Sequence, residues 1–337
     1  MVTQKGRPSL VTLLIKLDEE IKVLKNRGGL PVSLEANEIW KDIWLEETHH
    51  STALEGNTLN SKEVYNLVEQ DIVTGHKEMK HYLEVQGYAQ AARWVYEAAV
   101  ESAKNKDYII GPHHIRQIHS LLMGLVWQAY PPVTGDKPGQ IRTGPTPRIR
   151  GSSLKLPLSG DVPALLERLL NKINESWRPA YHPVEFAAEI HAEFEVIHPF
   201  VDGNGRTGRL LMNYMLILKG YPPALILKSQ RPKYLRALER AQGKDKDTYM
   251  LIELVARSVR DNLNKLLLPH MADSSDLIPL TALSEGTPYL PSYLRRLAQE
   301  GKLKAVKGGS SREIWLSSKK WLQEYIASRS PRGRRKK

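Results

Sequence analysis

The stretch IHPFVDGNGRTGR, residues 197–209, is the part of this chain that decides its fold and its chemistry. It brings a histidine, a carboxylate, a Gly-Asn-Gly turn and two arginines together in one short run. The almost wholly apolar residues 210–218 follow directly, which predicts a buried helix that begins at the motif. The first backbone N–H groups of a helix lack partners and lie at the positive end of its dipole. The stretch therefore predicts a site that binds a phosphate or another anion.

The residue types within this motif suit phosphate chemistry. Gly203 and Gly205 let the backbone approach a phosphate without a Cβ in the way. Arg206 and Arg209 are three residues apart, so both can reach one anion. Asp202 offers a hard oxygen ligand for a Mg²⁺ ion held mostly by phosphate oxygens and water. Each residue alone is as well explained by a simple helix cap; their combination before a buried helix favours a site. The motif does not match a P-loop, because it lacks Gly-Lys-Ser/Thr.

His198 is the candidate base of this site. An amphipathic helix is predicted over residues 183–196, and Pro199 disfavours helical backbone at the residue before it. His198 is therefore expected in a loop just past the helix end. An imidazole titrates near neutrality and can take a proton from an incoming hydroxyl.

Composition narrows the classes of protein that fit. The chain has 337 residues and no cysteine, which excludes disulfides, thiol catalysis and cysteine-ligated metals. It has no run of about 18 apolar residues, and its first residues lack the long apolar core of a signal peptide. We therefore expect a cytoplasmic protein with no membrane partner.

The positive charge is unevenly spread. The net charge is +12, and residues 269–337 hold 14 Lys and Arg against 6 Asp and Glu. Such a concentration indicates DNA or another acidic partner at this end. A solvated tail is the alternative for residues 329–337, which carry several of these charges.

Most of the chain predicts helix, so a mainly α fold is expected. Residues 130–157 differ: they are rich in proline, glycine and arginine, and they predict a surface loop or short hairpin. Residues 278–328 predict a separate unit with the order helix, helix, hairpin, helix, as in a winged helix-turn-helix. The predicted parts are an N-terminal helical region 1–110, a core 111–268, a linker 269–277, the unit 278–328 and a basic tail 329–337. Within the first two parts, helices are predicted at about 10–27, 36–55, 61 onward, 82–103, 112–127, 162–176, 183–196, 210–218, 232–242 and 248–267.

Residues 198–209 resemble the full signature of the Fic family, His-x-Phe-x-Asp/Glu-Gly-Asn-Gly-Arg-x-x-Arg, and every defining position matches. The similarity extends over about residues 36–268. It implies a Fic-type helical bundle with a short β-hairpin flap. It also implies transfer of a nucleotide part, usually AMP from ATP, to a Ser, Thr or Tyr hydroxyl of a protein target, the protein itself included. The unaltered signature favours AMP over the groups that some relatives transfer.

The resemblance also implies a role for each residue of the motif. His198 would be the general base, and Asp202 would hold Mg²⁺ between the α and β phosphates. Arg206 would contact the inner phosphates and Arg209 the γ-phosphate. The remaining positions would form the anion site, namely Gly203, Asn204 and Gly205.

A second motif, STALEGN at residues 51–57, lies at the end of a predicted helix spanning about 36–56. Ser51 and Glu55 are four residues apart and share a helix face, and Gly56 ends the helix. A carboxylate in the last turn opposes the helix dipole, and an exposed glutamate of little consequence is the plain alternative. The stretch resembles the inhibitory Ser-x-x-x-Glu-Gly motif of Fic proteins with their own inhibitory helix. That resemblance implies a pair between Glu55 and Arg209 that blocks the γ-phosphate, and in some relatives the same glutamate supports removal of AMP.

Two further stretches resemble parts of the family. Residues 138–142, PGQIR, are similar to a Pro-Gly-x-Tyr-Arg stretch, with Ile141 in place of tyrosine. The segment that follows would be the flap that aligns the target backbone by strand addition, although Pro145 and Pro147 remove backbone donors there. Tyr234 matches a helix beside the nucleotide, where stacking on the base and packing in the core are both open.

The unit 278–328 resembles winged or excisionase-like helix-turn-helix domains. Its basic second helix and hairpin suit DNA phosphates. Docking of a protein or formation of a homodimer is the alternative role for such a unit. The candidate DNA contacts are Arg295, Arg296, Lys304 and Lys307.

Two functions are therefore weighed. The first is a self-inhibited protein AMP-transferase that uses ATP and Mg²⁺. The alternative is a DNA-binding regulator that senses nucleotide with little or no turnover. The intact His198 favours the enzyme, since sensing alone needs no base.

Overall fold

A computed structural model describes residues 9–147, 154–175, 181–271, 277–285, 287, 289–300, 302–308 and 314–328. Contacts divide the chain into two units. The larger takes in residues 14–262, and the other runs from residue 263 onward together with the first residues up to 13. Each unit is described by itself.

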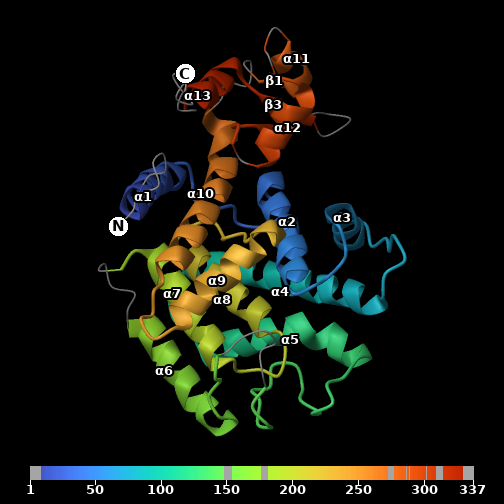
Figure 1. Ribbon diagram of the computed structural model, residues 1–337, viewed down its shortest axis with the longest axis vertical. Coiled ribbons are helices and arrows are strands. Elements are labelled where there is room, and N and C mark those ends of the chain that lie inside the picture. The colour runs from blue at the N-terminus through green and yellow to red at the C-terminus, as the bar shows by residue number, and fades with distance from the viewer. Residues whose placement is uncertain are drawn as a thin grey trace, which may run out of the picture. The chain divides into compact units, whose positions relative to one another are not determined.

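The larger unit is built from helices (Figure 1). Local signals set several of their ends. Asn37 caps the second helix by accepting from the Trp40 N–H, and Asn60 and Glu63 form a capping box at the third. Pro112 occupies the first turn of the fifth. The α-helices are α1 (Leu10–Asn26), α2 (Glu38–Leu54), α3 (Ser61–Glu69), α4 (Met79–Lys104), α5 (Pro112–Ala129), α6 (Val162–Glu175), α7 (Pro183–Ile197), α8 (Asn204–Leu218), α9 (Arg231–Gln242) and α10 (Tyr249–Met271), with short 3-10 turns at Ser159–Asp161 and Lys228–Gln230. Of these, α1 begins before residue 14 and α10 continues past residue 262, so both extend beyond the bounds of the larger unit.

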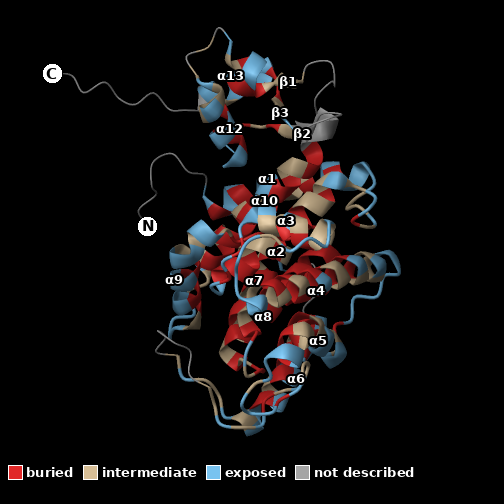
Figure 2. Cartoon of the chain, turned by 90° about the vertical axis from the view of Figure 1, so that its right-hand side faces the viewer, coloured by how far each residue is buried: buried red, intermediate tan, exposed pale blue. Residues whose placement is uncertain are grey.

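The core of the larger unit forms around α8. Every residue from 206 to 218 is buried, as the red ribbon of α8 in Figure 2 shows. An all-round buried helix requires neighbours on each side, and α4, α5, α7 and α2 all pack against it. The predicted buried helix is confirmed, and it begins at Asn204, so that the motif itself forms its first turn.

Two predicted segments can be compared with the structure. Residues 130–157 were predicted as a surface loop or a short hairpin; residues 130–147 and 154–158 form no strand, which fits the loop, and residues 148–153 lie outside the described part. Prolines along this segment remove the N–H groups that a strand pair needs. Of the linker expected at residues 269–277, residues 269–271 belong to α10, which continues to Met271, and residues 272–276 lie outside the described part.

The small unit holds β1 (Ile278–Pro279), α11 (Leu280–Ser284), α12 (Pro291–Gln299), β2 (Val306–Gly308), β3 (Ile314–Ser317) and α13 (Lys319–Ser328). The three strands form an antiparallel sheet in the order β1-β3-β2, with Val306 paired to Leu316. The predicted order of helix, helix, hairpin and helix is observed, and β1 is an addition. A separate core fills the unit, formed by Leu280, Leu283, Leu294, Leu297, Ala298, Leu303, Ala305 and Leu322.

Among the described residues, no helix combines the length and the apolar character that a membrane crossing requires.

Candidate active site

His198 directly follows α7 and ends that helix. Its backbone is left-handed, with φ 50° and ψ 61°, and its N–H donates to the carbonyl of Phe194 at 2.9 Å. Burial lowers the pKa of His198 to about 4, an effect that the backbone of Glu195 partly opposes. The ring is therefore neutral near pH 7, which is the state that a general base needs. The position predicted for His198, just past the helix end, is confirmed.

Asn204 closes the loop that runs from His198 to the start of α8. Its side-chain N–H donates to the carbonyl of Phe200 at 2.8 Å, and its side-chain oxygen accepts from the Phe200 N–H at 2.9 Å. Gly203 then caps α8 with a left-handed backbone, φ 79°. Because the side chain of Asn204 is buried in this exchange, it shapes the loop and is not free to contact an anion.

Asp202 and Arg206 lie together at the start of α8. The side chain of Asp202 is 61% exposed, and its Oδ1 lies 3.7 Å from the Arg206 guanidinium. Arg206 is buried and lies 4.0 Å from Glu84 of α4. Two carboxylates thus partly neutralise Arg206, and one of them is open to solvent.

Arg209 is buried and bound to α2 by three hydrogen bonds. Its Nε donates to Ser51 Oγ at 2.8 Å. Its Nη2 donates to the Ser51 carbonyl at 3.0 Å and to Glu55 Oε1 at 2.8 Å. The contact that was predicted between Glu55 and Arg209 is therefore present, between segments far apart in the sequence.

Glu55 is the residue that ends α2. Its backbone N–H donates to the Thr52 carbonyl at 3.1 Å, and Gly56 follows with φ 99°, a conformation that favours glycine. Burial acts to raise the pKa of Glu55, but Arg209 and Arg206 outweigh it and the pKa is lowered. A Cβ built on Gly205 would lie 2.6 Å from Glu55 Oε1. The charged carboxylate therefore rests against the start of α8, where an anion was predicted.

A buried polar layer lies behind Arg209. The Tyr234 hydroxyl is 2.7 Å from His191 Nε2, and the two rings are stacked. The Arg209 guanidinium lies 5.9 Å from the Tyr234 ring. Burial lowers the pKa of His191 to about 3 and raises that of Glu195 to about 8. Of the two roles open to Tyr234, the structure favours packing, because its side chain is buried and hydrogen-bonded.

Arg142 joins residues 137–143, here called the flap segment because the predicted flap follows from them, to residues 198–203, here called the motif loop, a role that the sequence did not predict. It is 1% exposed. Its Nε donates to the His198 carbonyl at 2.8 Å, and its backbone N–H donates to the Pro199 carbonyl at 2.9 Å. A further bond from Nη1 reaches Ser159 Oγ at 2.7 Å. The only signal in the sequence was the place of Arg142 in the Pro-Gly-x-Tyr-Arg-like stretch.

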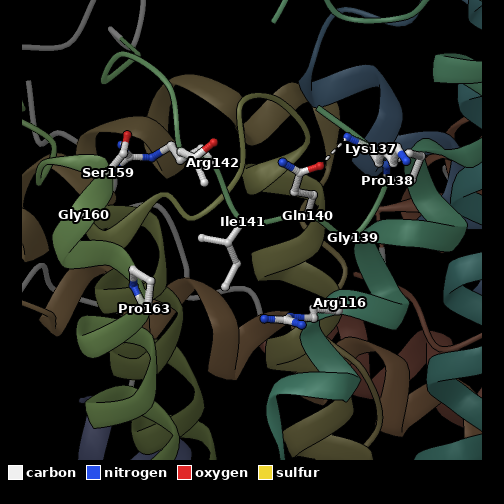
Figure 3. A pocket seen from close by; sticks show the side chains of 11 residues that line it. Arg116, Lys137, Pro138, Gly139, Gln140, Ile141, Arg142, Ser159, Gly160 and Pro163 are labelled. Atoms are coloured by element: carbon white, nitrogen blue, oxygen red, sulfur yellow. Dashed lines mark hydrogen bonds between the residues drawn. The ribbon is translucent and has the colours of Figure 1, made fainter. Parts of the chain in front are cut away.

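A pocket of about 650 Å³ opens beside this segment (Figure 3). Its walls are Arg116 of α5, residues 137–143, and the start of α6 with the turn before it. The side chain of Ile141 lies between Arg116 and Pro163 in Figure 3. A second pocket of about 310 Å³ reaches Asp202 and is otherwise lined mainly by apolar side chains, Trp127 and Val201 among them.

Glu47 is a second residue that the sequence did not single out. It is buried on α2 and accepts from the hydroxyls of Tyr88 and Tyr96 and from the side-chain amide of Asn213. Burial raises the pKa of Glu47, and these donors oppose that rise. It thus ties α2 to α4 and α8. A glutamate within an amphipathic helix gives no sequence signal that it will be buried.

Asp202 fits the metal role that the motif implies. It is an exposed carboxylate at the start of α8, and carboxylate oxygen is a ligand that Mg²⁺ prefers. The described part of the chain has no group of three or more His, Asp or Glu side chains that could hold a metal ion. A magnesium ion here would therefore depend on oxygens of a nucleotide and of water as well.

The candidate DNA contacts lie in the small unit. Arg295 and Arg296 are exposed on α12, and Arg296 lies 3.9 Å from Glu300. Lys304 pairs with Glu324 at 3.0 Å. Lys307 falls in β2, and its side chain lies outside the described part, as does the basic tail from residue 329. Two of the four contacts are therefore already paired with carboxylates.

Comparisons with known proteins place the motif within a known protein family model and identify relatives of the chain. Residues 109–216 match the family model described as Fic/DOC family. The chain is 30% identical over 289 residues to a protein adenylyltransferase Fic of Drosophila virilis, which covers 84% of this chain and 54% of the relative. It is 28% identical over 292 residues to a protein of the same name from Aedes aegypti, covering 85% and 54%. The chain thus spans about half the length of the curated relatives it matches.

Solved structures share the fold. Fic-1 of C. elegans superposes with a TM-score of 0.62 at 22% identity, covering 76% of this chain and 70% of its own. A Fic family protein of Desulfovibrio desulfuricans gives 0.57 at 21% identity, covering 95% and 97%. Together these comparisons show that residues 109–216, which hold the complete motif around His198, are similar to the family described as Fic/DOC, and that the chain shares the fold of solved Fic proteins.

Proposed function

We propose that this chain transfers AMP from ATP to a hydroxyl of a protein target, and that Glu55 restrains the transfer. The observation that carries the proposal is that the end of α7 and the start of α8 meet at the motif. Neutral His198 ends α7, and the start of α8, with Arg206 and Arg209, lies beyond a short loop. The adenylyltransferase names of the relatives support the choice of AMP.

In this mechanism His198 takes the proton of the target hydroxyl. The hydroxyl oxygen then bonds to the α-phosphorus of ATP, and the bond from that phosphorus to the bridging oxygen breaks, so that diphosphate leaves. The N–H groups at the start of α8 and the guanidinium of Arg206 would stabilise the charge that develops. A Mg²⁺ ion held by Asp202 and the nucleotide would neutralise phosphate charge.

The restraint acts through Arg209. The carboxylate of Glu55 and a γ-phosphate are both anions that a guanidinium can bind through two N–H groups. Arg209 already makes three hydrogen bonds to α2, one of them to Glu55. A nucleotide that needs Arg209 must therefore displace the carboxylate first.

Incubation with ATP labelled at the α-phosphate, in the presence of Mg²⁺, tests the proposal. Glu55→Gly should raise covalent labelling about tenfold, since coupling between sites is commonly worth 5–150-fold. Adding His198→Ala should reduce that labelling by at least about a hundredfold. Glu38→Gly, a matched change at an exposed residue of α2, should leave labelling near the wild-type level.

Two results would contradict the proposal. Label from the γ-phosphate in place of the α-phosphate would indicate phosphoryl transfer. No label in any variant, with ATP binding retained, would favour the nucleotide-sensing regulator.

DNA is a second candidate partner, supported by the excess of Lys and Arg in residues 269–337. A gel shift with duplex DNA at rising salt tests it. If the tail makes the contacts, replacing Arg332, Arg334 and Arg335 by alanine should weaken binding and flatten its salt dependence. Binding that is unchanged by these replacements would place the contacts elsewhere.

A further inference from the structure

His119 of α5 contacts two separate segments of the site. Its Nδ1 accepts from the backbone N–H of Gly139 at 2.8 Å, and its Nε2 lies 3.0 Å from the backbone carbonyl oxygen of Asp202. An amide N–H can only donate, so Nδ1 must be the unprotonated nitrogen. The neutral ring therefore carries its proton on Nε2 and donates it to the carbonyl of Asp202. One side chain thus joins the flap segment to the motif loop.

The ring of His119 has a fixed orientation. It is fully buried. Phe200 stacks on it with ring centres 3.7 Å apart and planes 10° apart, and Trp127 meets it edge-on at 5.3 Å. Both nitrogens are engaged, and a flip of the ring would exchange acceptor for donor at each partner.

One face of α5 supports both segments. Gly139 has φ 80°, and a Cβ on it would lie 3.0 Å from the carbonyl oxygen of Arg116. A Cβ on Gly203 would lie 2.9 Å from Met123 Sδ. Arg116, His119 and Met123 share a helix face. The flap segment and the motif loop therefore both approach α5 at glycines, with His119 between them.

We infer that His119 is a positioning residue that holds the flap segment at a set distance from the motif loop. Arg142 joins the same two segments near His198, and His119 joins them near Asp202. Two attachments fix the direction of a segment, whereas one leaves it free to turn. This inference rests on the proposed function, in which the flap aligns the target backbone so that its hydroxyl meets His198.

The test uses the full chain with Glu55→Gly, into which three substitutions are introduced. His119→Phe keeps a flat ring and removes both hydrogen bonds. His119→Asn places an oxygen where Nδ1 was and keeps an acceptor for Gly139. Gln117→Ala, at an exposed position on α5, is the control. The two readouts are hydrogen exchange at the Gly139 amide and the kinetics of α-phosphate labelling.

In His119→Phe the Gly139 amide should exchange about tenfold faster, the effect of losing one hydrogen bond. The kcat/KM for the protein target should fall tenfold to about a hundredfold, as expected for a misplaced reactant. The KM for ATP should change less than the kcat/KM for the protein target. His119→Asn should keep the protection of Gly139 and recover part of kcat/KM, and Gln117→Ala should match its parent in both readouts.

Unchanged exchange at Gly139 in His119→Phe would overturn the inference, whatever the activity. So would faster exchange with an unaltered kcat/KM. If His119→Phe does not fold, His119→Asn is compared with His119→Gln. His119→Gln retains a donor for Asp202 but no acceptor for Gly139. The inference then fails if the Gly139 amide exchanges equally fast in both variants, or if kcat/KM is the same in both. If Glu55→Gly itself shows no labelling, the proposed function fails, while the exchange experiment still decides whether His119 holds the flap.

Discussion

Arg209 has three acceptors on α2, and only one of them carries a charge. Ser51 supplies the other two, through its hydroxyl and its carbonyl. Loss of the Glu55 carboxylate would therefore remove the competing anion and leave the guanidinium held at Nε and at Nη2. Under the proposed function Arg209 later binds phosphate, and it gains from being held in place beforehand. Ser51 and Glu55 thus act on the same arginine in different ways.

Glu195 gives a prediction about pH. Burial raises its pKa to about 8 from an ordinary value of 4.5. Between these two values the folded protein holds a proton that the unfolded chain releases, so the contribution of this group to stability falls as pH rises through that window. Glu195→Gln stays neutral, and its stability relative to wild type should rise from pH 5 to pH 8. Urea denaturation at both values measures this.

The control for this prediction is Glu97→Gln, which changes an exposed carboxylate of α4. Its stability relative to wild type should vary little over the same range. A constant difference between Glu195→Gln and wild type at all pH values would show that Glu195 is already ionised in the folded state.

At this scale the sequence predicted residues whose chemistry is local. His198, Asp202 and the two arginines stand in one contiguous motif, whereas the pair of Glu55 with Arg209 was implied only by the family resemblance of a second motif. The roles of Arg142, His119 and Glu47 were not predicted, because these residues matter through their burial between segments far apart in the chain. No pattern of neighbouring residues distinguishes a buried arginine in a proline-rich loop from an exposed one.

Among the elements, helices were predictable because apolar spacing and caps are local signals. The start of α8 at the motif was predicted, because the apolar run from Leu210 and the glycines before it are both local signals. The segment 130–157 was expected as a surface loop or a short hairpin, and its described part is a loop, in which prolines remove the donors that a strand pair needs. The strand β1 was missed, because two residues carry no periodicity.

The end of α2 is held from outside by α9, and this contact gives a second prediction. The Nε of Arg231 donates to the carbonyl of Leu54, the residue before Glu55, at 2.8 Å. Without this bond the last turn of α2 should fray and the carboxylate should leave Arg209 more often. Arg231→Met is expected to raise α-phosphate labelling severalfold, and less than Glu55→Gly does. The loss of one hydrogen bond should lower stability by about 1 kcal/mol.

Arg236→Met is the matched control, an exposed arginine on the same helix. It should change neither labelling nor stability. If both variants labelled alike, the charge of α9 and not the bond to Leu54 would be responsible. An Arg231→Met variant with wild-type labelling would show that α2 is held without this contact.

For the molecule as a whole, buried histidines predict a loss of stability in acid. Burial lowers the pKa of His119 and His198 to about 4 and that of His191 to about 3. Below their ordinary pKa of 6.5 the unfolded chain binds protons that the folded protein excludes, so these three rings should lower stability as pH drops from 6.5 to about 4. Glu195 acts in the opposite direction over part of this range, and the three rings should outweigh it. Glu55, whose pKa is lowered, acts in the same direction at lower pH.

Denaturant unfolding at pH 7, 5.5 and 4.5 measures this prediction. His191→Gln, which removes one of the three rings from the titration, should show a shallower dependence on pH than wild type. Stability that stays level between pH 6.5 and 4.5 would show that these rings take up protons without unfolding.

The carboxylate of Glu55 is, in effect, a ligand attached to its own receptor. It lies against Gly205 and Arg209, where a nucleotide phosphate would compete with it. A tethered ligand has an effective concentration set by the geometry of the chain, and dilution does not lower it. The restraint should therefore be equally strong at any protein concentration. It can be relieved by displacing α2 or by supplying an anion that binds more tightly. The fraction of sites occupied by nucleotide then depends on the nucleotide concentration relative to the constant effective concentration of the Glu55 carboxylate.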